Sequence, residues 1–133
     1  MTEAISAAIA EHAESDPLAV LRHMITGVVD GLTRDPRRAQ ILFGDHAGSA
    51  VLERRRHELT LVSTDKITGG MQPYLRADVN RAELRHTALM AVGGFGELVI
   101  AWRAGLVDLD PEAIIEQAVH FGSTLGANFL PPE

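Results

Sequence analysis

The segment from Asn80 to Ala104 constrains the fold most, because it is a long predicted helix that is apolar on two opposite faces. At 100° per residue, one face carries Leu84, Ala88, Ala91, Phe95, Leu98 and Trp102, and the other carries Leu89, Gly93, Gly96 and Ile100. A helix on the surface of a small domain needs only one apolar stripe. We therefore expect this helix to be covered on both sides, either inside a larger bundle or between its own bundle and a second chain. The second arrangement is favoured, because the other segments are short.

Helix-start signals recur along the chain and predict an all-α fold. An Asp-Pro pair stands at 16–17 and again at 110–111, and Asn80 with Glu83 has the spacing of a capping box. Apolar residues recur every three or four positions in the longer segments, a short helix is predicted through 36–43 and a turn at 44–49, and no alternating strand pattern is found. The sequence predicts an antiparallel helical bundle of about six helices. Residues 1–15 are interpreted as an N-terminal helical remnant and residues 16–133 as one domain.

Composition argues against several classes of function. Twelve Lys and Arg against eighteen Asp and Glu give a formal net charge of -6, which disfavours binding to a phosphate backbone. The chain has no cysteine, so disulfides, thiolate metal sites and cysteine nucleophiles are excluded. The most apolar stretch, 87–102, is shorter than the ~20 residues of a membrane span, and no secretory signal is recognisable at the N-terminus. We expect a cytoplasmic protein that does not bind a membrane.

Small residues form a ridge on the last predicted helix, where Ala118, Gly122 and Gly126 are spaced by four. Glycine inside a helix costs up to about 1 kcal/mol relative to Ala, so these positions are interpreted as sites where another helix comes close. Neutral drift in a tolerant helix, or bending, is the alternative. The predicted homodimer interface through the last two helices consists of Leu89, Gly93, Gly96, Ile100, Ala118, Gly122, Leu125 and Gly126.

Three motifs, in this order, resemble the C-terminal domain of TetR-family transcriptional regulators. They are D-P-R-R-A at 35–39, G-x-x-E-L-V-x-A-W-x-x-G at 94–105, and D-P-E at 110–112. The resemblance covers about residues 16 to 130. It implies an all-α domain that binds small, often apolar effectors in a pocket between helices. It also implies dimerisation through a four-helix bundle made of the last two helices of each chain.

The N-terminus departs from that family, whose members begin with a three-helix DNA-binding unit. The residues before Asp16 are rich in Glu and Ala and contain no Arg or Lys. A recognition helix needs such donors for phosphates and base edges. We therefore expect no DNA binding by this chain alone, whether it is part of a longer regulator, a naturally shortened relative or one half of a split regulator.

The apolar helix faces also predict a ligand pocket, because cavities in helical bundles are lined by apolar side chains with few polar groups. Small Ala91 facing Phe95 leaves room, and Met24 is adaptable. His57 or Glu97 would supply a polar contact to a less apolar ligand. The predicted lining residues are Met24, Val28, Leu59, Val62, Ala91, Phe95 and Leu98.

Other groupings of residues are interpreted as structural. Glu83 and His86 have the E-x-x-H spacing of di-iron bundles, but no second such pair exists, so no metal or other cofactor is predicted. Ser63 and Ser123 each have a histidine nearby in the sequence, and both are interpreted as surface neighbours of it, because no G-x-S-x-G elbow accompanies them. The run at 54–56, three arginines, is either a solvated helix face or a contact for an anionic ligand.

The sequence thus predicts the effector-binding and dimerisation domain of a TetR-like regulator. The alternative is a helical homo- or heterodimerisation module without DNA binding that modulates a partner regulator, and a small bundle enzyme is the third hypothesis. A cavity within the helices favours the first hypothesis, and a core that lacks one favours the second.

Overall fold

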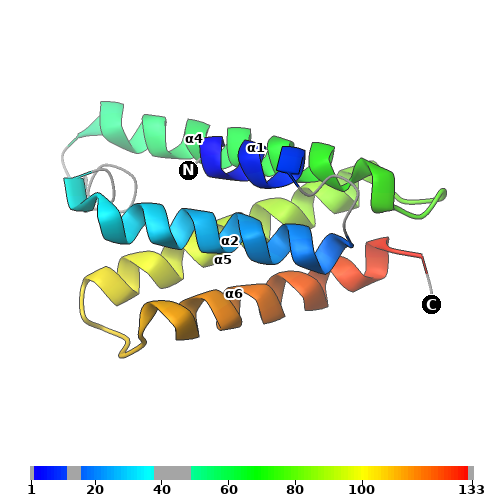
Figure 1. The fold of residues 1–133 in the computed structure, drawn as a ribbon. Coiled ribbons are helices and arrows are strands. Elements are labelled where there is room, and N and C mark those ends of the chain that lie inside the picture. Colours follow the sequence, from blue (N-terminus) through cyan, green and yellow to red (C-terminus); the bar gives the residue numbers. More distant parts are fainter. Residues whose placement is uncertain (1, 12–15, 38–48, 132–133) are drawn as a thin grey trace.

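The computed structural model describes residues 2–11, 16–37 and 49–131, and these residues fold into an all-α domain, as the sequence predicts (Figure 1). No strand is present in these three ranges. The helices are α1 (Thr2–Glu11), α2 (Pro17–Arg34), α4 (Ala50–Met71), α5 (Arg81–Arg103) and α6 (Pro111–Gly126), with 3-10 turns η1 (Gln72–Tyr74) and η2 (Ala127–Phe129). The predicted short helix through 36–43 and the predicted turn at 44–49 lie largely outside the described residues, as do the last two residues of the D-P-R-R-A motif.

Local capping explains where these helices begin and end. The side chains of Asp16, Asn80 and Asp110 each accept a hydrogen bond from the backbone N–H three residues further on, at 2.9, 3.1 and 2.7 Å. α5 ends where Gly105 adopts a positive φ of 76°, a conformation that glycine takes without strain. These four positions match the helix limits that the sequence predicts.

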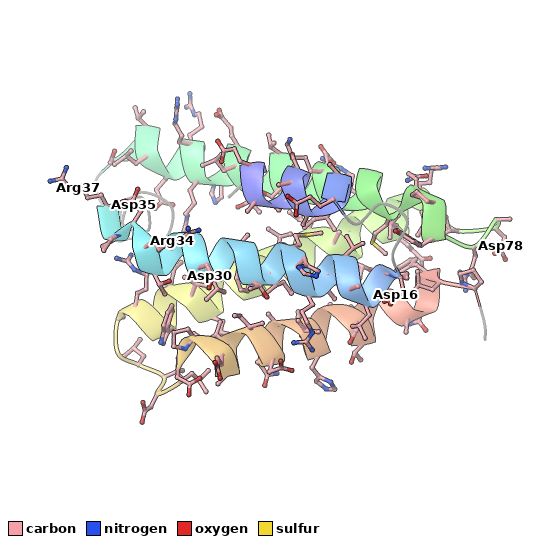
Figure 2. All side chains as sticks on the ribbon, in the orientation of Figure 1. Asp16, Asp30, Arg34, Asp35, Arg37 and Asp78 are labelled. Carbon is pink, nitrogen blue, oxygen red and sulfur yellow. The ribbon has the colours of Figure 1, made fainter. Side chains whose placement is uncertain are left out.

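The five helices contact one another in a ring, which places no helix at the centre. α1 packs on α2, α2 on α6, α6 on α5, α5 on α4, and α4 returns to α1. Figure 1 shows α4 and α1 on one side of α2 and α6 on the other, with α5 behind α2. Charged side chains such as Asp16, Asp30 and Arg34 lie on the outside of this ring (Figure 2). The apolar faces of the five helices therefore meet around a central space.

α1, which lies within the predicted N-terminal helical remnant, packs against the other helices. Ile5 and Ala8 of α1 are buried in the same apolar cluster as Val28 of α2 and Val99 of α5. Its docking requires close approach, because a Cβ atom added at Gly27 would lie 3.3 Å from Cβ of Ala4. α1 therefore shares the apolar core of the other helices.

An exposed ion pair joins the neighbouring helices α2 and α6. Arg22 donates hydrogen bonds to both carboxylate oxygens of Glu116, and the distance from Nη2 to Oε2 is 3.3 Å. This hydrogen bonding, and then the charge of Arg22, lowers the pKa of Glu116 below its ordinary value of 4.5. The stabilisation from the pair is thus fully present above this ordinary value and is lost as the pH falls through the lower pKa of the folded protein.

Substituting Glu116 with glutamine is expected to make unfolding less sensitive to acid. The variant should be slightly less stable than the parent at pH 7 and closer to it at pH 3, because the parent loses its charged partner on protonation. Urea unfolding of both proteins at several pH values measures the difference. Since the pair is exposed, 1 M salt should also reduce the difference at pH 7. A difference that stays the same at every pH would contradict a role for this ion pair.

None of the helices in the described ranges is both long and apolar enough to cross a lipid bilayer.

Candidate ligand cavity

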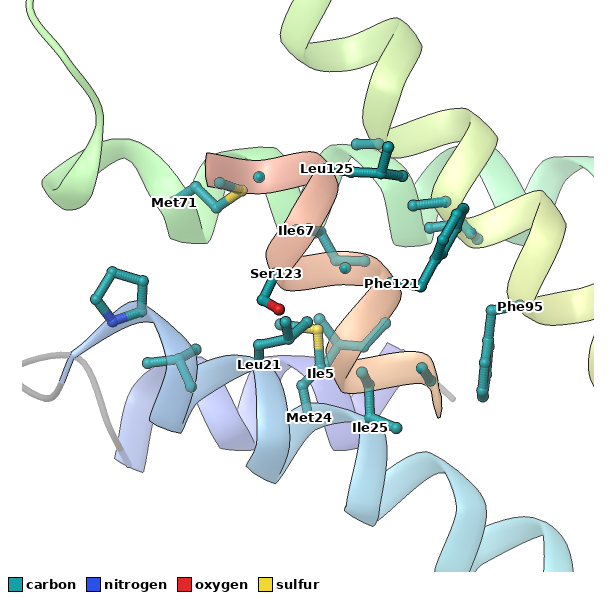
Figure 3. A pocket seen from close by; sticks show the side chains of 18 of the residues that line it. Ile5, Leu21, Met24, Ile25, Ile67, Met71, Phe95, Phe121, Ser123 and Leu125 are labelled. Carbon is teal, nitrogen blue, oxygen red and sulfur yellow. The ribbon is translucent and has the colours of Figure 1, made fainter. Parts of the chain in front are cut away.

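The ring of helices surrounds a cavity of about 630 Å³. Five helices packed in a ring are held apart at the centre, and their side chains fill that space only in part. All five contribute to the wall, with Ile5 from α1, Met24 from α2, Ile67 from α4, Phe95 from α5 and Leu125 from α6 (Figure 3). The volume falls within the roughly 300–1,000 Å³ that small-molecule sites occupy in proteins.

The wall of the cavity is almost entirely apolar. None of the thirty lining residues, all from the described ranges, is an Asp, Glu, Lys, Arg or His. A ligand that enters the cavity therefore meets hydrocarbon, aromatic and thioether surface with few hydrogen-bonding groups. The polar side chains in the lining are Ser63, Tyr74, Thr87, Gln117 and Ser123.

Five of the seven predicted ligand-binding residues line this cavity, namely Met24, Val28, Ala91, Phe95 and Leu98. The other two, both on α4, do not. Leu59 lines a smaller pocket of about 190 Å³ between α4 and α5, and Val62 is 45% exposed on the outer side of α4. His57 and Glu97, the predicted polar contacts, also line the small pocket and not the main cavity.

The two residues of α4 differ from the prediction because the inner face of this helix includes polar residues and its outer face includes some apolar ones. Ser63 and Thr64 are buried, whereas Val51, Leu61 and Val62 are exposed. Thr64 is buried at low cost, because its hydroxyl donates a hydrogen bond of 2.8 Å to the carbonyl oxygen of Thr60. The sequence predicts that Ser63 is a surface neighbour of a histidine. This prediction is wrong, because Ser63 is buried.

Half of the predicted dimer interface, its four α6 residues, lines the cavity of its own chain. Ala118, Gly122, Leu125 and Gly126 all line the cavity. At Gly122 the expected close approach is present, but within the chain, because an added Cβ would lie 3.1 Å from Cδ2 of Leu21 in α2. Within the chain, the neighbour of the α6 ridge at Gly122 is therefore α2.

The predicted interface residues of α5 divide between the inside and the outside. Ile100 packs against the apolar cluster, Gly96 lines the small pocket, and Leu89 is half-buried. Gly93 is exposed, and an added Cβ there would meet no atom within 4 Å. Of the eight predicted interface residues, Gly93 is therefore the one that is fully outward-facing.

Sequence reasoning missed the contribution of α1 to the cavity. Ile5 and Ile9 line it, and they are spaced by four on a helix that has no other large apolar residue. The sequence carried one signal of this contribution. Two other helices contain a glycine, Gly27 in α2 and Gly70 in α4, at which a third helix such as α1 can pack closely. A Cβ atom at Gly70 would lie only 2.5 Å from Cδ1 of Ile9.

The residues considered for metal binding do not gather into a site. In the described ranges, no group of three or more His, Asp or Glu side chains is placed to hold a metal ion. Glu83 and His86 are both exposed on α5.

No protein-family model, curated protein or solved structure matches the chain.

Proposed function

We propose that this chain is the effector-binding and dimerisation domain of a TetR-like transcriptional regulator, and that it does not bind DNA by itself. The observation that carries the proposal is the apolar cavity of about 630 Å³ in the centre of the helix ring. The cavity is partly open to solvent, because exposed residues such as Leu18 and Phe121 stand in its lining, so a ligand has a way in. Its size and apolar wall suit a small organic effector.

The position of the cavity supports a role in signalling, because its wall includes every helix in the described ranges. A ligand that binds better to one arrangement of these helices than to another shifts the population toward that arrangement. α1 contributes two isoleucines to the wall, so the occupancy of the cavity is expected to alter the packing of α1 on α2 and α4. In a regulator, such a shift changes the relative position of two domains and, through them, the affinity for DNA.

The outer surface of α5 supports the dimerisation part of the proposal. Met90 is 64% exposed, and Gly93, which is also exposed, lies one turn from Met90 on the same face of α5. A large apolar side chain beside an exposed glycine favours close contact with another helix. We propose that a second copy covers this outer face of α5.

Sedimentation and a fluorescent probe test the two parts of the proposal separately. The probe N-phenyl-1-naphthylamine is uncharged, and its emission rises in apolar surroundings. We expect saturable binding of one probe per chain, and a sedimentation velocity that corresponds to a dimer. The absence of saturable probe binding would overturn the effector-binding part. A dimer that binds no probe would favour the alternative function, a dimerisation module that modulates a partner regulator.

Substituting Met90 with aspartate is expected to convert the dimer to a monomer that still binds the probe. A charge placed in an apolar interface is desolvated without a partner, whereas at an exposed position of the single chain it costs little. Sedimentation over a range of concentrations gives the change in the dissociation constant, which we expect to be at least about tenfold. Leu106 is the control, since it is 79% exposed in the loop after α5, and aspartate there should leave the dimer unchanged. A dimer that survives in the Met90 variant would show that this face is not the interface.

A further inference from the structure

Ser63 is the most deeply buried polar side chain in the wall of the cavity. It lies on α4, its exposed fraction is 1%, and its Oγ atom has no hydrogen-bond partner among the described residues. A buried hydroxyl without a partner destabilises a folded protein, because it has lost its hydrogen bonds to water. Such a group needs an explanation, and its place in the cavity wall suggests one.

The other hydroxyl groups in this part of α4 all have partners. Thr60, Thr64 and Thr68 donate hydrogen bonds of 3.0, 2.8 and 3.1 Å to backbone carbonyl oxygens of the preceding turn. This is the usual way in which a helix satisfies a threonine or serine in its interior. Ser63 stands among these residues on the same helix, and its hydroxyl is the one left without such a bond.

The remaining polar groups of the wall differ from Ser63 in burial or in bonding. The hydroxyl of Ser123 donates to the carbonyl oxygen of His120 at 3.0 Å. Gln117 is exposed, and Tyr74 and Thr87 are half-buried. The wall also lacks any charged side chain that could neutralise a charge on a ligand. An ionised ligand would therefore lose its hydration without gaining a partner.

From these observations we infer that the cavity selects uncharged, largely hydrocarbon ligands with one hydrogen-bonding group, and that the hydroxyl of Ser63 binds this group. The inference rests on the proposed function, since it requires the cavity to bind a ligand. The inference adds the chemical class of the ligand. It also names Ser63 as the residue that distinguishes such a ligand from a plain hydrocarbon.

Three probes of nearly the same shape test the inference. N-phenyl-1-naphthylamine carries one N–H group, 1-benzylnaphthalene has a methylene group in its place, and 8-anilinonaphthalene-1-sulfonate adds a negative charge. We expect the amine to bind about two- to tenfold more tightly than the hydrocarbon, the range that one neutral hydrogen bond gives. The sulfonate should bind at least tenfold more weakly than the amine. Fluorescence titration, with displacement of the amine by the hydrocarbon, measures all three affinities.

The variants Ser63→Ala and Thr64→Val separate the effect of a hydrogen bond between Ser63 and the ligand from the effect of a change in the packing of α4. In Ser63→Ala the preference for the amine over the hydrocarbon should disappear, and the melting temperature of the free protein should rise, because the unpartnered hydroxyl is gone. Thr64→Val removes a buried hydroxyl that already has a partner and does not line the cavity. This variant should keep the preference, and its melting temperature should not rise.

The outcomes separate this inference from the function on which it rests. If the amine and the hydrocarbon bind the parent protein equally well, or if Ser63→Ala weakens both alike, the assignment of Ser63 is wrong while effector binding stands. Equal binding of the sulfonate and the amine would overturn the selection against charge. If no probe binds, both the inference and the effector-binding function are overturned.

Discussion

Replacing Gly70 with leucine is expected to lower the free energy of unfolding by about 3 kcal/mol and to release α1 from the bundle. A Cβ atom at this position would lie 2.5 Å from Cδ1 and 2.8 Å from Cγ1 of Ile9, closer than atoms can approach. Overpacking of a closed contact costs typically 1–3 kcal/mol. The displacement of α1 would also expose Ile5 and Ala8, whose burial contributes to the core.

Gly69 provides a matched control, because it is the preceding residue of the same helix and faces the other way. An added Cβ there would meet no atom within 4 Å, so leucine at 69 should be neutral or slightly stabilising through its better helix propensity. Urea unfolding measures the stability of both variants, and hydrogen exchange of the amides of residues 2–11 reports the release of α1. Equal stability of the two variants would show that α1 does not dock closely on α4.

The helices themselves could be predicted because their signals are local. Asp16, Asn80 and Asp110 act through backbone groups three residues away, and Gly105 acts through its own φ angle. Such features depend little on what surrounds the helix. The predicted all-α class and the starts of α2, α5 and α6 are therefore confirmed by the structure.

The arrangement of the helices could not be predicted in the same way, because it depends on contacts between distant segments. Gly122 shows the difference. Its spacing with Ala118 and Gly126 correctly indicated a close approach, but the sequence does not say which helix approaches, and the partner is Leu21 of α2. A small residue indicates that a neighbour is near without indicating whether it belongs to the same chain.

Hydrophobicity was misleading on α4 for a related reason. Periodicity assumes that the most apolar face of a helix is turned inward. On α4 the inner positions include Ser63 and Thr64, while Val62 is outside. The hydroxyl of Thr64 is satisfied by the backbone of its own helix, so it packs as a small apolar group would. Such a face cannot be recognised from residue hydrophobicity, and the residue that we propose to bind the ligand's polar group lies on it.

Replacing Ala91 with tryptophan is expected to reduce the affinity for N-phenyl-1-naphthylamine by about 100-fold, or about 2.7 kcal/mol, without unfolding the protein. Ala91 lines the cavity from α5. An indole group there would occupy space that the probe needs. Because the group enters an existing apolar void, its burial should offset the cost of small shifts in the wall, and the stability should be kept or increased.

Ala82 is the control for this substitution, since it lies in the first turn of the same helix and is exposed. Tryptophan at 82 should leave probe binding unchanged, which separates the effect of filling the cavity from that of adding an aromatic residue to α5. Fluorescence titration gives the affinities, and urea unfolding confirms that each variant is folded. Full probe affinity in a folded Ala91→Trp protein would place the probe outside the central cavity. The proposed effector site would then lose its physical basis, because the space between the five helices would be a packing defect that binds no ligand.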